Sequence, residues 1–470
     1  MSQDGEKGVF TRGNTMRHVV VMTATSSVGL VAIFLVDAIN LFYISLLGQQ
    51  ELAAAIGYAA TIMFFSISIC IGIAIASAAL VGRALGAGSV SKSRELATAS
   101  LIYLVVIASI FAAALYPILP TVLHLLGARG ETLELAAQFM RIVVPSIPIL
   151  GLGMCLGALL RAKGDPRRAM FVTLSGGAAA LILDPLFIFG FDLGLVGAAL
   201  ATFCVRIILV IVGLHGVWKV HDMLGPVTVN GLKEFAAPFL SIAGPATATQ
   251  LATPVGNAYV TSVIAGFGDD AVAGWAIVGR ILPVAFGVIF ALSGAVGPIM
   301  SQNYGAALYK RVLQTLRDSL LFTLIYCLAI WALLALLAEP LTTVFGATGD
   351  AAELVRIFCL YVAGSFLFNG ALFVANAAFN NLGYPVYATL FNWGRATIGI
   401  IPFVAVGQAW GAEGVLIGWG LGAIVFGAAA MVTAFYLVRQ LPSKARAEDL
   451  AERHVPPAAN SPFTSGKGSS

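Results

Sequence analysis

Residues 52–82 read LAAAIGYAATIMFFSISICIGIAIASAALVG, an apolar stretch of 31 residues without a charged side chain. As an α-helix it would be about 46 Å long at a rise of about 1.5 Å per residue, which exceeds the roughly 30 Å hydrocarbon thickness of a bilayer. Similar apolar runs recur along the whole chain. A β-barrel shows short alternating segments instead, so these runs predict membrane-spanning helices.

Composition excludes several classes of protein. Of the 470 residues, 59% are hydrophobic and 10% are charged, whereas soluble domains carry about 25% charged residues. A soluble enzyme, a nucleic-acid-binding protein and a disordered chain are therefore excluded, and the lipid bilayer is the expected environment. The five cysteines lie inside apolar stretches, and their spacing is not that of metal ligands. Neither a metal site nor a cofactor is therefore expected.

The apolar runs predict an all-α membrane protein. They predict twelve helices near 18–46, 52–82, 96–119, 135–160, 169–190, 195–217, 236–266, 272–300, 315–338, 352–379, 386–408 and 412–438. Lys and Arg gather in the loops on one side, while only Arg129 falls in the loops on the other side. By the positive-inside rule, both termini are predicted to be cytoplasmic in a multi-pass protein of the cell (inner or plasma) membrane.

The two halves of the chain repeat. At an offset of 219 residues, RALGA at 83–87 matches QNYGA at 302–306, and KGDP at 163–166 matches LGYP at 382–385. Six helices begin and end on the same side of a membrane, so the repeat predicts two parallel six-helix bundles related by a pseudo-two-fold axis along the membrane normal. This is a transporter architecture.

The repeat also predicts the domain organisation. We expect a monomer with a cytoplasmic N-terminus at 1–17, an N-lobe at 18–217, a cytoplasmic linker at 218–235, a C-lobe at 236–440 and a disordered cytoplasmic tail at 441–470.

Two carboxylates fall deep inside predicted spans, Asp37 and Asp184, and both lie in the N-lobe. A charged carboxylate there costs about 2.5 to 3.5 kcal/mol, so the pair is expected to face a wet cavity and to bind protons or a cation. A structural alternative for Asp37 is a hydrogen bond to a neighbouring hydroxyl, such as that of Ser26, Ser27 or Tyr43. For Asp184, which precedes Pro185, the alternative is a side-chain cap at a helix kink.

Three arginines also fall deep inside predicted spans. Arg206 lies one turn after Thr202 on the same helix face and is expected either to pair with an aspartate or to act as a structural counter-ion. Arg280 and Arg395 have no deep acid in their own half, so we expect them to donate to carbonyls at helix breaks. Arg141 and Arg356 lie near helix ends, where long side chains reach the interface.

Several short stretches together resemble the multidrug and toxic compound extrusion (MATE) family. They are VD at 36–37, LRAKGDP at 160–166, LDPLFI at 183–188, GLVGAALAT at 194–202 and QNYGA at 302–306. The resemblance spans roughly residues 15 to 440. It implies a secondary active antiporter that exports amphipathic, often cationic compounds in exchange for protons or sodium by alternating access.

The resemblance also implies roles for single residues. Asp37 and Asp184 fall on the N-lobe carboxylates used for coupling, and Thr202 falls on a nearby polar position; these three are the candidate sodium ligands. Ala180 stands where many relatives have an asparagine, which removes one sodium ligand and favours protons. Thr253 stands near where other exporters have a C-lobe glutamate, so the chain resembles the branch that relies on N-lobe carboxylates (DinF-like).

Other details of the resemblance stay open. Ser26 occupies the position that matches Pro245, so a proline-hinged first helix is in doubt. Candidate polar groups of the transport cavity, each equally compatible with helix-packing hydrogen bonds, are Asn40, Tyr43, Gln138, Thr202, Arg206, Asn257, Tyr259 and Asn369.

Two alternative functions are weighed. A flippase for a lipid-linked saccharide would be expected to line its cleft with several cations, and in the second half only Arg280 and Arg395 qualify. An intramembrane aspartyl protease also needs two membrane aspartates, but its Gly-x-Gly-Asp and Tyr-Asp motifs are absent. A transporter without enzymatic activity is therefore the favoured interpretation.

Overall fold

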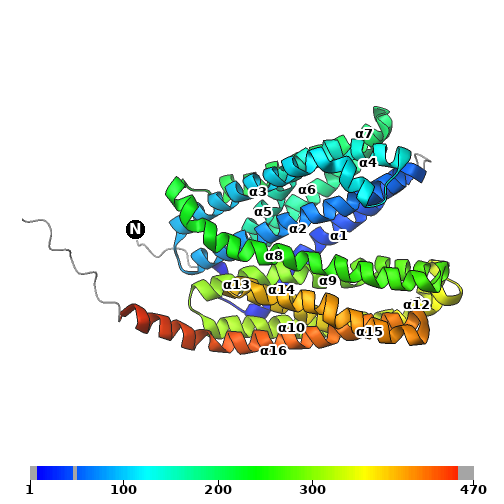
Figure 1. The fold of residues 1–470 in the computed structure, drawn as a ribbon. Coiled ribbons are helices and arrows are strands. Elements are labelled where there is room, and N and C mark those ends of the chain that lie inside the picture. Colours follow the sequence, from blue (N-terminus) through cyan, green and yellow to red (C-terminus); the bar gives the residue numbers. More distant parts are fainter. Residues whose placement is uncertain (1–7, 46–49, 454–470) are drawn as a thin grey trace, which may run out of the picture.

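The structure is a computed structural model that describes residues 8–45 and 50–453. Nearly all of these residues are helical, which confirms the all-α prediction (Figure 1). A short 3-10 turn, η1 (Val9–Thr11), precedes the first bundle. The helices of the first bundle are α1 (Thr15–Ser45), α2 (Gln50–Gly86), α3 (Val90–Leu125), α4 (Gly130–Val143), α5 (Ile147–Lys163), α6 (Pro166–Pro185) and α7 (Gly194–Leu214).

The second bundle repeats this order, adds the short helix α11 and divides the counterpart of α6 into α14 and α15. Its helices are α8 (Val229–Ile264), α9 (Asp269–Gly305), α10 (Tyr309–Leu336), α11 (Ala338–Val344), α12 (Gly349–Leu360), α13 (Phe366–Leu382), α14 (Pro385–Gly394), α15 (Ile400–Gly407) and α16 (Gly411–Arg453). Ten apolar runs in the described residues are long enough to span a membrane. One of them, 385–444, folds back so that α15 packs on α16. Helix α8 is not among the ten, because its prolines and polar residues lower its mean hydropathy. If α8 is added and the folded run is counted as two helices, the total is the twelve helices that were predicted.

The bundles meet through a symmetric set of helix pairs. Across the interface α1 packs on α9 and α2 packs on α8, while α2 also packs on α9. Figure 1 shows the bundles converging at the end that carries the N-terminus and diverging toward the other end. We call the first of these the closed end, and it corresponds to the side predicted to be cytoplasmic.

The N-terminal part of each bundle packs into the hydrophobic core of the other bundle. Phe10, Val19 and Met22, from η1 and α1, belong to the second bundle's hydrophobic core. Phe235 and Phe239, at the beginning of α8, belong to a core of the first bundle. The closed end is therefore interlocked, because neither core is complete without residues from the other bundle.

Two predicted helices are broken at equivalent points. The helix predicted at 135–160 is interrupted by a 3-10 turn, η2 (Val144–Ser146), and the one at 352–379 by η6 (Val362–Ser365). Pro145 lies in the first of these turns and has no amide hydrogen to continue an α-helical ladder.

The repeated KGDP and LGYP motifs are helix-to-helix turns. Gly164 and Gly383 end α5 and α13 in the left-handed conformation, with φ of +98° and +96°, which costs little for a residue without a Cβ. Pro166 and Pro385 then open the next helices, where a missing amide hydrogen is tolerated.

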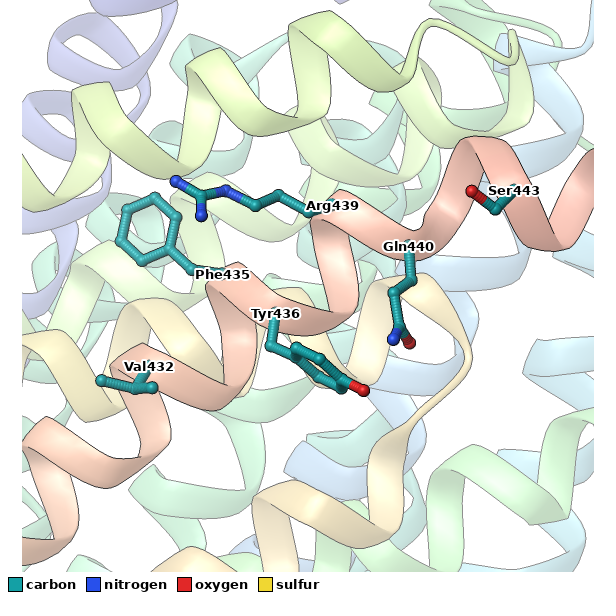
Figure 2. A pocket seen from close by; sticks show the side chains of 6 residues that line it. All are labelled: Val432, Phe435, Tyr436, Arg439, Gln440 and Ser443. Atoms are coloured by element: carbon teal, nitrogen blue, oxygen red, sulfur yellow. The ribbon is translucent and has the colours of Figure 1, made fainter.

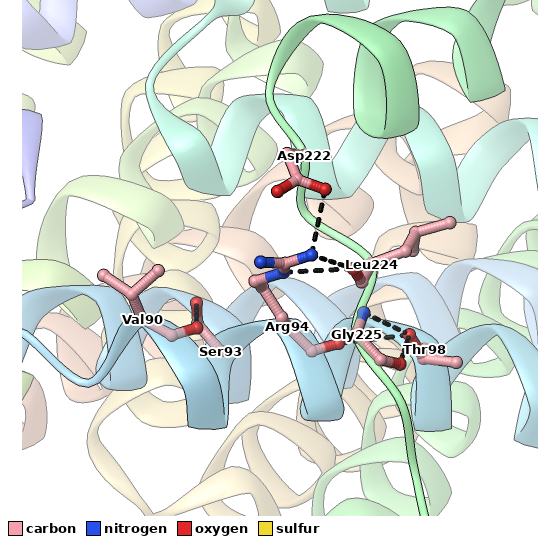
Figure 3. A network of polar contacts seen from close by, with 7 residues as sticks. All are labelled: Val90, Ser93, Arg94, Thr98, Asp222, Leu224 and Gly225. Atoms are coloured by element: carbon pink, nitrogen blue, oxygen red, sulfur yellow. Dashed lines mark hydrogen bonds and ion pairs between the residues drawn. The ribbon is translucent and has the colours of Figure 1, made fainter.

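The linker and the tail differ from the prediction. The first bundle continues through a π-helical turn, η4 (His215–Val220), and α8 begins at Val229, so the connection is shorter than 218–235. Figure 3 shows how α3 fixes it: Arg94 bonds the Asp222 carboxylate at 2.9 Å and the Leu224 carbonyl at 2.8 Å, and Thr98 bonds Gly225.

The predicted tail also begins later than 441, because α16 continues as a helix to Arg453.

Candidate functional site

Asp184 is buried in the first bundle. It occupies the last turn of α6, and only 2% of its surface is exposed. Among the described residues its carboxylate has no hydrogen-bond or ion-pair partner, so the structure does not show the helix-capping contact weighed as an alternative. A π-helical turn, η3 (Leu186–Gly190), follows directly, and such turns are frequent at functional sites.

Asp37 lies in α1, and its side chain and that of Asn40 lie outside the described residues. The helices that carry the two aspartates pack side by side. A Cβ built on Gly177 of α6 would lie 3.2 Å from Cγ2 of Val36, and the rings of Tyr43 and Phe189 meet edge to face at 6.2 Å. Along the chain, Asp37 lies between Val36 and Tyr43, and Asp184 lies between Gly177 and Phe189. Both aspartates therefore lie between the same two contacts of this helix pair.

Arg206 does not pair with Asp184. Its guanidinium, 5% exposed, donates to the Val143 carbonyl at 3.0 Å and to the Ser146 hydroxyl at 2.6 Å. These acceptors flank the break between α4 and α5, where α-helical hydrogen bonding is interrupted. The arginine therefore satisfies the broken helix, the kind of role expected for the arginines of the other half.

The candidate polar residues lie at several depths and do not form one cluster in the described contacts. The hydroxyl of half-buried Thr202 donates to the Ala198 carbonyl at 2.9 Å within α7. Gln138 is exposed on α4, Asn257 and Tyr259 are half-buried on α8, and Asn369 of α13 is 5% exposed. Ala180 is buried one turn before Asp184 and offers no side-chain ligand.

The deep charged side chains predicted in the second bundle are arginines, and neither falls on the position equivalent to Asp184. Arg395, 5% exposed at the beginning of the π-helical turn η7 (Arg395–Gly399), donates to the Thr253 hydroxyl at 2.8 Å instead of the expected carbonyl. Its buried Nε has no partner among the described atoms. Arg280 is exposed and has no carbonyl or ion-pair contact among the described residues.

Helical periodicity shows which way Arg280 points. It precedes Gly287 by seven residues, about two turns, so both lie on one face of α9. Gly287 meets α1 of the first bundle, where its Cβ would lie 3.9 Å from Cγ2 of Val31. The exposed side chain of Arg280 therefore lies on the face that α9 turns toward the first bundle.

Neither a metal cluster nor the detected groove adds to this site. Within residues 8–45 and 50–453, no three His, Cys, Asp or Glu side chains gather in a metal-binding arrangement. A groove of about 570 Å³ runs along α16 (Figure 2) and is lined by Val432, Phe435, Tyr436, Arg439, Gln440 and Ser443. None of the predicted site residues lines it.

Sequence reasoning missed the contacts of the N-terminal segment at the closed end. The amide of Phe10 donates to Oε1 of Gln302 at 2.9 Å, and Arg311 donates to the Phe10 and Gly13 carbonyls. The only signal of this contact region in the sequence was the repeat match between residues 83 and 302. A sequence match alone does not show that the matched positions face each other in the fold.

Comparisons with known proteins agree with this architecture. The MatE family model matches residues 25–186 and 245–405. An FAD transporter of Shewanella oneidensis is 28% identical over 92% of this chain and 97% of its own length. The multidrug export protein MepA of Staphylococcus aureus is 24% identical over 89% of this chain and 93% of its own.

A solved structure has the same fold. A variant of the MATE transporter VcmN of Vibrio cholerae superposes with a TM-score of 0.87 at 24% identity, over 91% of this chain and 97% of that one. The family model covers more than half of the chain, and the matching proteins are transporters and not enzymes. The chain therefore belongs to the MatE family of membrane transporters, as the resemblance of the stretches at 36–37, 160–166, 183–188, 194–202 and 302–306 predicted.

Proposed function

We propose that this transporter exports amphipathic organic compounds in exchange for protons, with Asp37 and Asp184 as the coupling carboxylates. The observation that carries the proposal is Asp184, which is 2% exposed and has no partner among the described residues. A charged carboxylate without a counter-ion costs about 2.5 to 3.5 kcal/mol inside a membrane. Binding a proton removes that cost.

The exchange follows from which ligand occupies the site. With the cavity open to the cytoplasm, substrate binds while the carboxylates are ionised. Once the cavity opens to the outside, protons neutralise the carboxylates and the substrate is released. Each proton supplies about 1.4 kcal/mol per pH unit and about 2.3 kcal/mol per 100 mV, so one or two protons sustain a tenfold to several-hundredfold gradient.

Sodium is the alternative coupling ion, bound by Asp37, Asp184 and Thr202. Oxygen ligands suit such an ion, but Ala180 contributes none, and the Thr202 hydroxyl already donates to Ala198. Protons are therefore favoured. Together with Thr253 in α8, this supports assignment to the branch that relies on first-bundle carboxylates.

The test is export from proteoliposomes with pH and sodium gradients imposed separately. Asp184→Asn and Asp37→Asn should each lower pH-driven export at least about tenfold, because neither amide titrates. Asp192→Asn is the matched control, since Asp192 is exposed and its φ of +53° suits asparagine. Export by Asp184→Asn at the wild-type rate under a fixed pH gradient would falsify the proposal.

The substrate could be an organic cation or an organic anion. The family resemblance implies organic cations, and the relative MepA is named a multidrug export protein. An anionic compound is favoured by Arg280 on the face toward the first bundle and by the relative named an FAD transporter. Export of a cationic dye and of a flavin dinucleotide, each measured in wild type and in Arg280→Gln, distinguishes them, because only anion export should fall in the variant.

We also propose that the protein works as a monomer in the cell membrane with both termini cytoplasmic; the Lys and Arg bias of its loops supports the orientation of the termini. Protease accessibility of terminal tags in inside-out vesicles tests the orientation. Protection of both tags there would reverse it.

A further inference from the structure

Arg83 and Gln302, which the repeat pairs at an offset of 219, make the same contact in opposite directions. Arg83 of α2 donates from Nε to the Asn381 carbonyl of α13 at 3.0 Å. Gln302 of α9 donates from Nε2 to the Ala162 carbonyl of α5 at 2.6 Å. Residues 162 and 381 are separated by the same offset, so each side chain reaches the equivalent carbonyl in the other bundle.

Both acceptors need a donor from elsewhere. Ala162 and Asn381 lie in the last turns of α5 and α13, directly before Gly164 and Gly383. The last carbonyls of a helix have no partner in their own helix and must be satisfied by other groups. We call these two bonds the cross-bundle caps, because each completes a helix end of one bundle with a side chain of the other.

The backbone around the caps is in direct contact. A Cβ on Gly86 would lie 1.9 Å from the Gln302 carbonyl oxygen, and one on Gly305 would lie 2.0 Å from the Arg83 carbonyl oxygen. The ends of α2 and α9 therefore touch without intervening side chains. Separation of the bundles at this end would pull both donors away from their acceptors.

The N-terminal segment covers one of the two caps. Gln302 is fully buried and its Oε1 accepts the Phe10 amide. Asn303 and Arg311 both donate to the Phe10 carbonyl, at 3.2 and 3.0 Å. The Gln302 cap is therefore held within a larger network, whereas Arg83 stacks on the Tyr304 ring at 5.4 Å.

We propose that Arg83 and Gln302 are positioning residues of the transport cycle. Their cross-bundle caps stabilise the conformation closed at this end, and both bonds break when the bundles separate there. The inference rests on the proposed alternation between two conformations but not on the coupling ion. Loss of a net hydrogen bond changes an equilibrium constant by about fivefold, and loss of a charged donor by roughly tenfold or more.

Three variants separate the caps from general packing. Arg83→Met and Gln302→Met keep an unbranched side chain that reaches the position of the donor nitrogen, Nε of arginine or Nε2 of glutamine, and remove the donors. Arg83→Gln gives the first bundle the donor that the second bundle uses, so it should restore the closed conformation relative to Arg83→Met. Arg317→Met and Gln440→Met are matched controls, because both side chains are exposed on helices of the second bundle.

The measurement is the distance between spin labels on the full-length protein in nanodiscs, without an ion gradient. Labels at exposed Ser91 and Ser443 report on the closed end, and labels at exposed Glu131 and Asp350 report on the other end. Gln302→Met should raise the ratio of long to short distances at the closed end about fivefold, and Arg83→Met roughly tenfold. Distances at the other end should shorten.

Two results would overturn the proposal. One is an unchanged closed-end distribution in the Arg83→Met/Gln302→Met double variant, and the other is Arg83→Gln behaving like Arg83→Met. Neither bears on the coupling ion, because no gradient is present. Conversely, failure of the Asp184→Asn test leaves these distances unaffected, so the two proposals fail independently.

Discussion

The two bundles share their helix order, breaks and turns, but they differ in the buried groups that carry charge. The first bundle holds Asp184, and its Arg206 is bound by two acceptors at a helix break. The second holds Arg395, which has one acceptor and an unpaired Nε. At the register set by Pro185 and Pro402, Ile401 stands where the first bundle has Asp184. The two bundles thus share a framework, and the carboxylate proposed for coupling lies at a position where their sequences differ.

Replacing the buried arginines tests this difference most strongly. Arg206→Met should lower the free energy of unfolding by about 3 kcal/mol, because two buried hydrogen bonds from a charged donor are lost and the Val143 carbonyl keeps only the Ser146 hydroxyl as a donor. Arg395→Met should cost less than about 1 kcal/mol, since it removes a buried charge that has a single partner. Reversible unfolding in mixed micelles measures both, and equal losses would contradict the asymmetry.

Adding a methyl group where the bundles touch should affect both halves equally. Gly86→Ala and Gly305→Ala each place a Cβ about 2 Å from a carbonyl oxygen of the other bundle, so each should destabilise the closed form by about 2 kcal/mol. Gly57→Ala is the control, because a Cβ there would meet nothing within 4 Å. A large effect at only one of the two contact glycines would show that the interface is not symmetric.

The smallest expected effect concerns the turns. Asp165 accepts the Arg168 amide at 3.0 Å as the N-cap of α6, whereas Tyr384 gives α14 no side-chain cap. Asp165→Ala should therefore cost about 1 kcal/mol, and Tyr384→Ala should not alter the capping of α14. Both are measured by thermal unfolding at pH 7.

The same cap should depend on pH. Partial burial alone would raise the pKa of the Asp165 carboxyl, but hydrogen bonds from Arg168 and His221 outweigh it and leave the pKa below its usual value. A carboxylate with a lowered pKa in the folded state contributes stability at neutral pH and loses it as the pH falls below about 4. The difference between wild type and Asp165→Ala should shrink there. A constant difference from pH 7 to pH 3 would exclude this role.

The sequence was sufficient for the framework because its signals are local. Apolar runs such as 52–82 predicted the helices, and Gly164 and Gly383 marked turns that only the repeat made conspicuous. Asp184 stood out because charge is rare inside a membrane. These features depend on spacing and solvation, which a linear sequence contains.

Contacts between distant segments were beyond prediction. Arg206 donates to acceptors at a helix break 60 residues away in the chain. The sequence around Arg206 does not show whether its partner is that helix break or an aspartate. Similarly, Phe10 lies in a segment interpreted as a polar terminus, yet it is 3% exposed and packs in the second bundle's hydrophobic core. A helix pattern shows which residues share a face but not what that face meets.

The exchange of Phe10, Val19 and Met22 for Phe235 and Phe239 between the two cores has a consequence for biosynthesis. When the first bundle leaves the ribosome, the partners of its N-terminal segment have not yet been translated, and part of its own core still lacks α8. Halves expressed separately would each present an incomplete core, so the two halves are expected to complete their folding as one unit.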